Sequence, residues 1–246
     1  MAKISKWLGA GLGWTFGGPI GGILGYVLGS FVDGFSEVEI KEYQHEARNN
    51  TNTVSGDFEI SLLVLAAIVI KADGKIDKRE LDFVRSTFIG MYGESRAHRA
   101  FKLFKGIIAD NNISTRQVCM QIKQHMPHAS RLQLLHFLFG VAKADGVVTQ
   151  EEMHKIHIIA GYLNINEHDF ISIKAMFYNE VNSSYQILEI EKNATDSEVK
   201  KAYRKMVKKY HPDKLHNIGP EHLKGAEEKF RQVQNAYERI QKERGM

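Results

Sequence analysis

The chain has 246 residues, 43% of them hydrophobic and 25% charged, which is typical of a soluble globular protein with one or two domains. Its single cysteine, Cys119, excludes a disulfide framework and a multi-cysteine zinc site, and its apolar helical surroundings predict a core residue. The net charge of +4 comes entirely from residues 183–246, and this local excess of positive charge favours an acidic protein partner. The sequence has no aromatic RNA-binding signature and no zinc-finger spacing, so we expect no nucleic-acid partner.

Residues 7–32 form an apolar stretch without a charged residue, WLGAGLGWTFGGPIGGILGYVLGSFV. At about 1.5 Å per residue, a helix of this length could cross a bilayer core. Glycine recurs at every fourth position from Gly9 to Gly29, a spacing that lets membrane helices approach closely and self-associate. The nine glycines of the stretch disfavour a helix in water. We therefore expect residues 1–35 to be a glycine-rich segment that associates with a membrane.

Other interpretations of this segment stay open. Gly17-Gly18-Pro19 could break it into a helical hairpin that lies on a membrane or packs against protein, and it could be a soluble packing or oligomerisation segment. A cleaved signal peptide is a third interpretation, although no A-x-A-like site follows. Lys3 and Lys6 before the segment balance Lys41 and Arg48 after it, so the positive-inside rule does not decide its orientation.

Residues 36–56 are polar, end in RNNTNTVSGD and have no apolar period, so we interpret them as a linker. Residues 57–180 are predicted to be helical throughout. They begin with FEISLLVLAAIVIKADG, an apolar run that suits a buried helix but is too short to span a membrane. Capping-box patterns predict the starts of three later helices, at Asp77-x-x-Glu80, Ser114-x-x-Gln117 and Thr149-x-x-Glu152.

Two segments of this region match at an offset of 72 residues: KADGKIDKREL (71–81) and KADGVVTQEEM (143–153). The match predicts two similar helix–turn–helix units. Neither segment is an EF-hand loop. Val69 and Lys71 would occupy the first and third positions of the loop, and their side chains cannot coordinate calcium; the second copy fails in the same way.

The repeated turn has a structural interpretation and a functional one. In the first, Gly74 and Gly146 take the left-handed conformation that ends a helix, and Asp77 and Thr149 cap the next helix. In the second, an acidic cluster from both turns binds a divalent ion or a partner; its members would be Asp73, Glu80, Asp145 and Glu152.

An all-helical region with two ADG turns, each followed by a capping glutamate, resembles a TerB-like (tellurite-resistance B type) domain over roughly residues 57–180. The resemblance implies an α-helical fold with an interaction or signalling role, such as recruiting clients or regulators, and no defined reaction.

The C-terminal region begins with SSYQILEIEKNATDSEVKKAYRKMVKKYHPDK (183–214). Thr195 and Glu198 form a capping box before an amphipathic helix. The apolar face of that helix comprises Val199, Ala202, Tyr203, Met206, Val207 and Tyr210. A later helix has its own apolar face, comprising Ala226, Phe230, Val233, Tyr237 and Ile240. Proline stops the first helix at His211-Pro212-Asp213, which predicts an antiparallel helical pair.

These residues closely resemble the J-domain of DnaJ-like co-chaperones, through Tyr185, Leu188, AYRKMVKKYHPDK (202–214) and KFRQVQNAYERI (229–240). The resemblance covers about residues 183–243, within an expected J-domain of residues 183–246. It implies a protein that binds a DnaK-type heat-shock chaperone and stimulates its ATP hydrolysis. The family's contact tripeptide maps onto His211, Pro212 and Asp213. Its basic helix surface maps onto Lys200, Lys201, Arg204, Lys205, Lys208 and Lys209.

His211 and Asp213 have no second base, nucleophile or metal-ligand set beside them, so we expect partner contacts, with neither enzymatic catalysis nor a cofactor. The loop KLHNIGPEHLKG is longer than in a minimal J-domain, and no cysteine-repeat client module follows it. The expected fold is all-α: a glycine-rich N-terminal segment, a TerB-like helical bundle and a J-domain hairpin.

This order of regions resembles membrane-anchored DnaJ-like proteins. It implies a location on the cytoplasmic side of the inner membrane, or in the cytoplasm if the N-terminal segment is not an anchor. Two alternative functions stay open: a divalent-metal or envelope-stress sensor with an accessory J-domain, and an inactive J-like scaffold.

Overall fold

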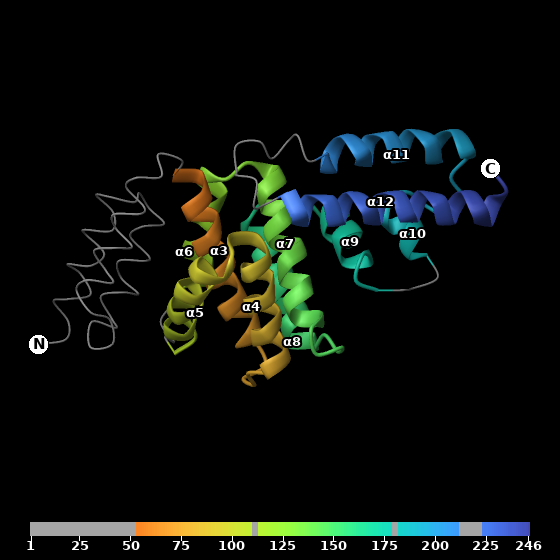
Figure 1. The fold of residues 1–246 in the computed structure, drawn as a ribbon. Coiled ribbons are helices and arrows are strands. Elements are labelled where there is room, and N and C mark those ends of the chain that lie inside the picture. The colour runs from red at the N-terminus through yellow and green to blue at the C-terminus, as the bar shows by residue number, and fades with distance from the viewer. Residues whose placement is uncertain (1–52, 110–112, 179–181, 212–222) are drawn as a thin grey trace, which may run out of the picture.

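A computed structural model of the chain describes residues 53–109, 113–178, 182–211 and 223–246, and the regular structure in these ranges is entirely helical, as the sequence predicts (Figure 1). The helices are α3 (Thr53–Ile70), α4 (Lys78–Tyr92), α5 (Glu94–Ala109), α6 (Thr115–His125), α7 (His128–Lys143), α8 (Gln150–Tyr162), α9 (Glu167–Ala175), α10 (Ser183–Ile187), α11 (Asp196–Tyr210) and α12 (Leu223–Arg244). We refer to α3–α9 as the central domain and to α10–α12 as the C-terminal domain.

Helices α3 and α7 pack against each other at the centre of the central domain, and α4, α5, α6, α8 and α9 surround them (Figure 1). From Phe58 to Ile70 every residue of α3 is buried except Ile68, which is half-buried. A helix that is apolar on all sides is stable in water only when its neighbours cover it completely. The predicted buried helix is therefore confirmed. Cys119 is also fully buried, as expected of a core residue.

The start of α3 differs from the sequence prediction. The helix begins at Thr53, so residues 53–56, which we assigned to the linker, form its first turn. Val54 is the single apolar residue among these four, which is too little to show a helical apolar period in the sequence. No helix in the described ranges is both long and apolar enough to cross a membrane. The apolar segment 7–32 lies outside the described residues.

The two repeated turns connect α3 to α4 and α7 to α8, and they are built alike. Gly74 and Gly146 have φ values of 79° and 98°, as predicted for the left-handed residue that ends a helix. Asp77 and Thr149 each cap the next helix in a complete capping box. Arg79 donates a hydrogen bond of 2.9 Å to the Asp145 carbonyl oxygen, so the two turns also contact each other.

The C-terminal domain is an antiparallel pair of helices, α11 and α12, with the short α10 packed on α12 (Figure 1). Val199 and Met206 of α11 and Val233 of α12 are completely buried between them. The rings of Tyr203 and Tyr237 stack across the pair with centroids 4.1 Å apart. The two apolar faces predicted from helical spacing are thus confirmed.

The C-terminal domain extends from the central domain as an arm (Figure 1). The first turns of α12 contact α7, and α10 packs on α9. The Ser172 hydroxyl of α9 donates a buried hydrogen bond of 2.8 Å to the Ile187 carbonyl oxygen of α10. The described parts of the two domains therefore share a packed joint.

Candidate functional site

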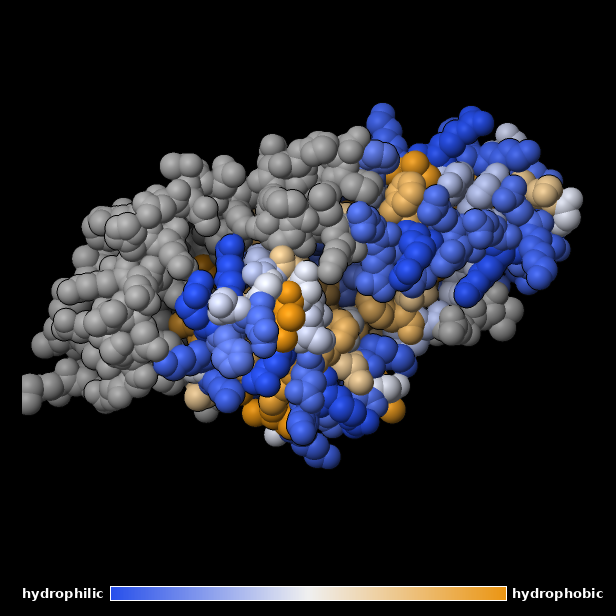
Figure 2. All heavy atoms as spheres, in the orientation of Figure 1, coloured by the Kyte–Doolittle hydropathy of each residue, from blue (hydrophilic) through white to orange (hydrophobic). Residues whose placement is uncertain are grey.

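The cations predicted to contact a partner lie on α11, whose start is fixed by its capping box. The Glu198 carboxylate accepts a hydrogen bond of 2.7 Å from the Thr195 backbone N–H, and the Thr195 hydroxyl accepts one of 3.3 Å from the Glu198 backbone N–H. Five of the six cations are exposed: Lys200, Lys201, Arg204, Lys205 and Lys208. Figure 2 shows a largely hydrophilic surface over the arm that contains α11.

Lys209, the sixth predicted cation, lies in a different environment. Its side chain is only 19% exposed and binds the carboxylates of Asp169 and Glu189. Lys205 also binds Glu189, at 2.8 Å, but its side chain is 66% exposed. The structure thus does not place all six cations on one free surface.

The end of α11 leads into the predicted contact turn. His211 takes an extended conformation, with φ −60° and ψ 131°, which the following proline favours. His211 is exposed, and its ring approaches the Phe230 ring edge-on with centroids 6.0 Å apart. Helix α12 therefore helps to position this side chain. Pro212 and Asp213, the other two members of the predicted tripeptide, lie outside the described residues.

Sequence reasoning missed a buried lysine on α12 near this turn. Lys229 is 2% exposed, and its Nζ lies 5.6 Å from the centroid of the Tyr210 ring. Burial lowers the pKa of Lys229 to about 7. Its spacing could have revealed it, because Lys229 follows Ala226 by three residues and precedes Val233 by four, on the apolar stripe of α12.

The acidic cluster expected from the two repeated turns is brought together only in part. Glu80 and Glu152 are both buried, and burial, followed by the nearby Glu152 carboxyl group, raises the pKa of Glu80 to about 8. A proton on Glu80 lets two neighbouring carboxyl groups share the site without repulsion. Asp73 and Asp145 instead accept backbone hydrogen bonds of 2.9 Å within their own turns.

No group of three or more histidine, cysteine, aspartate or glutamate side chains in the described ranges is arranged to hold a metal ion. The geometry of the two turns supports their structural interpretation, since each carboxylate has a role in capping or in the turn itself.

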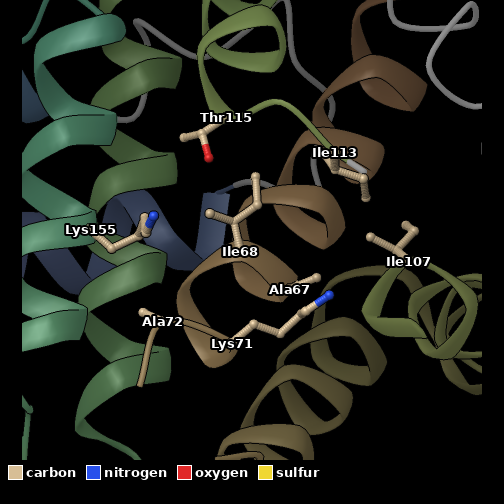
Figure 3. A pocket seen from close by; sticks show the side chains of 8 residues that line it. All are labelled: Ala67, Ile68, Lys71, Ala72, Ile107, Ile113, Thr115 and Lys155. Atoms are coloured by element: carbon tan, nitrogen blue, oxygen red, sulfur yellow. The ribbon is translucent and has the colours of Figure 1, made fainter. Parts of the chain in front are cut away.

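A hollow of about 210 Å³ lies beside the first repeated turn, between α3, the end of α5 and α8 (Figure 3). Its lining is Ala67, Ile68, Lys71, Ala72, Ile107, Ile113, Thr115 and Lys155. The lining contains two lysines and no carboxylate, so the hollow does not suit a cation.

Comparisons with known families match three regions of the chain. The family described as tellurite resistance protein TerB matches residues 59–175, the DnaJ domain matches residues 183–244, and the co-chaperone DjlA transmembrane domain matches residues 1–50. The last match points to a membrane-anchored protein.

The chain is similar to curated co-chaperones over most of its length. It is 28% identical over 227 residues to co-chaperone protein DjlA of Coxiella burnetii, which covers 81% of this chain and 82% of the relative. It is 27% identical over 232 residues to co-chaperone protein DjlA of Photobacterium profundum, with 80% and 82% covered. Chaperone protein DnaJ of Fusobacterium nucleatum subsp. polymorphum is 48% identical over 54 residues, 22% of this chain and 14% of that protein.

No solved structure matches the chain significantly. The relatives and the DnaJ-domain match support a co-chaperone function, a regulatory rather than enzymatic role, and a DnaK-type chaperone as partner. The chain therefore contains one region similar to the TerB family and one similar to the DnaJ domain, and it resembles the DjlA co-chaperones over about 80% of its length.

Proposed function

We propose that this protein binds a DnaK-type heat-shock chaperone through α11 and the turn at His211, and that binding stimulates ATP hydrolysis by the chaperone. The observation that carries the proposal is the exposed cationic face of α11, which ends at the exposed His211 ring. Cations on one face of a helix attract an acidic partner and help to fix its orientation.

The restricted backbone of His211 supports the same proposal. Proline restricts its own backbone and that of the preceding residue, so His211 loses little conformational freedom on binding. Phe230 limits the freedom of the imidazole ring further. The chemical step takes place in the ATP site of the chaperone, and this protein supplies only the contact surface.

We further propose that residues 1–50 anchor the protein to the inner membrane with the J-domain on the cytoplasmic side, where a DnaK-type chaperone has ATP. The proposal draws on the match to a transmembrane family. Glycines at every fourth position would let two such segments pack closely, which favours self-association of the anchor.

Two substitutions test the contact turn. His211→Gln and Asp213→Asn in the full chain should each remove most of the stimulation of ATP hydrolysis by a DnaK-type chaperone, while the helical circular dichroism stays unchanged. His98→Gln, an exposed histidine of α5, is the matched control and should stimulate like the unchanged protein. Full stimulation by both His211→Gln and Asp213→Asn would contradict the proposed function.

A further inference from the structure

The six cations of α11 separate into two sets around the helix. Successive residues are about 100° apart, so Lys200, Arg204, Lys208 and Lys201 share an arc of about 100°. All four are exposed, and none of them forms a salt bridge with another residue in the described ranges. Lys205 and Lys209 lie beside this arc, on a flank of the helix that faces carboxylates of other segments of the chain.

That flank meets two carboxylates with little exposure to solvent. The Glu189 side chain, which lies between α10 and α11, is 5% exposed and binds both Lys205 and Lys209. The Asp169 side chain of α9 is 2% exposed and binds Lys209. Lys209 therefore connects two segments of the C-terminal domain to the central domain, and this role requires its ammonium group to stay in the joint.

The surroundings of Asp169 show that this carboxylate is held in place to receive a cation. Its Oδ2 accepts a hydrogen bond of 3.1 Å from the Asn166 side-chain amide and lies 2.9 Å from His128 Nε2, while Oδ1 binds Lys209. Burial alone would raise the pKa of Asp169, but the bonds from His128 and Lys209 outweigh it and lower the pKa to about 2. The loss of Lys209 would leave a buried carboxylate without its main cation.

The residue after Lys209 belongs to the same joint. The Tyr210 ring is 5% exposed, and the Nζ atoms of Lys209 and Lys229 each lie 5.6 Å from its centroid. A void of about 10 Å³, room for about one water molecule, separates these side chains from Ala129 and Gln133 of α7. The last turn of α11 is thus packed on the central domain on one side and open to solvent on the other.

From this division we propose that the cations of α11 serve two different partners. Lys209, with Lys205 beside it, fixes the C-terminal domain on the central domain of its own chain, whereas Lys200, Lys201, Arg204 and Lys208 meet the acidic surface of the chaperone. The second half rests on the proposed function. The resemblance to J-domains implies that all six cations contact the chaperone. The structure instead gives different surroundings to cations that are adjacent in the same helix.

Lys208→Gln and Lys209→Gln in the full chain form a matched pair for the test, since they make the same chemical change at adjacent positions. Lys208→Gln should raise the chain concentration needed for half-maximal ATPase stimulation several-fold at low salt and should weaken its dependence on salt. It should leave amide hydrogen exchange in α9 and α10 unchanged. Lys209→Gln should accelerate that exchange at least tenfold and should leave the half-maximal concentration within twofold of the unchanged protein.

Asp169→Asn tests the same joint from the other side without altering any cation of α11. It should reproduce the Lys209→Gln exchange pattern, and combining the two substitutions should add little, because both remove one contact. Lys209→Arg should restore the slow exchange. The proposal is wrong if Lys209→Gln weakens stimulation as much as Lys208→Gln, or if exchange in α9 and α10 stays slow.

The two proposals fail in different ways. If the unchanged protein does not stimulate a DnaK-type chaperone at all, the proposed function is wrong and the chaperone half of this inference falls with it. The hydrogen-exchange comparison still decides whether Lys209 holds the joint.

Discussion

Replacing Lys229 by methionine should stabilise the full chain, because it removes a buried ammonium group and keeps a side chain of similar length. Lys229 is 2% exposed, and no carboxylate in the described ranges forms an ion pair with it. Its near neighbours include the Tyr210 ring and His136. The pKa of His136 lies well below its ordinary value, first because His136 is buried and second because Lys229 is close. The charged form of Lys229 is therefore disfavoured in the folded state.

The size of the effect follows from the pKa of Lys229, which burial lowers from 10.5 to about 7. At about 1.4 kcal/mol for each pH unit, a charged Lys229 costs up to about 5 kcal/mol of folding free energy. Below pH 7 the folded and unfolded chains both carry the proton, and the full cost applies. Between pH 7 and pH 10.5 only the unfolded chain carries it, so stability rises by up to about 1.4 kcal/mol per pH unit.

The assay is urea unfolding of the full chain at pH 6, 7, 8 and 9, compared for the unchanged protein, Lys229→Met and Lys242→Met. Lys242 is an exposed lysine of the same helix and serves as the control. Lys229→Met should be more stable by a few kcal/mol at pH 6, and its advantage should shrink at higher pH. Parallel stability curves for Lys229→Met and the unchanged protein from pH 7 to pH 9 would refute this reasoning.

Three further substitutions test the local structure by thermal and urea unfolding. Thr195→Ala removes the cap of α11 and should cost about 1 kcal/mol, whereas Thr195→Ser should retain most of the stability. Gly146→Ala places a Cβ at a φ of 98° and should cost about 1 kcal/mol or more, whereas Gly161→Ala, in open space on α8, should be neutral or stabilising; equal effects would contradict the turn geometry. With its pKa raised to about 8, Glu80 keeps its proton in the folded chain between pH 4.5 and pH 8, where the unfolded chain has lost it, so stability falls as the pH rises through this range. Glu80→Gln should remove that fall; an unchanged pH profile would contradict the raised pKa of Glu80.

The features that the sequence predicts correctly are set by residues close together in the chain. Thr195 caps α11 because its hydroxyl accepts a hydrogen bond from the backbone N–H of Glu198, only three residues further along the chain. Gly146 takes a positive φ because a left-handed residue is needed where α7 ends. His211 is extended because proline follows it. Such rules involve only neighbouring residues, so one sequence is enough to apply them.

The features that the sequence does not reveal depend on contacts between distant segments. Lys209 and Asp169 are separated by 40 positions. In the sequence, Asp169 looks like any acidic residue in the first turn of a helix, here α9. The repeat predicts similar turns but gives no indication that Glu80 and Glu152 meet. In each case the packing of whole helices decides which polar groups come together, and a helical pattern does not specify that packing.

The most direct test of the central claim is a single-turnover measurement of ATP hydrolysis by a DnaK-type chaperone at increasing concentrations of the full-length protein. The hydrolysis rate should rise and saturate with the unchanged protein, and the His211→Gln variant should give no such rise at any concentration. A rate that stays at the level of the chaperone alone with the unchanged protein, or that rises equally with His211→Gln, would show that the contact turn does not stimulate the chaperone.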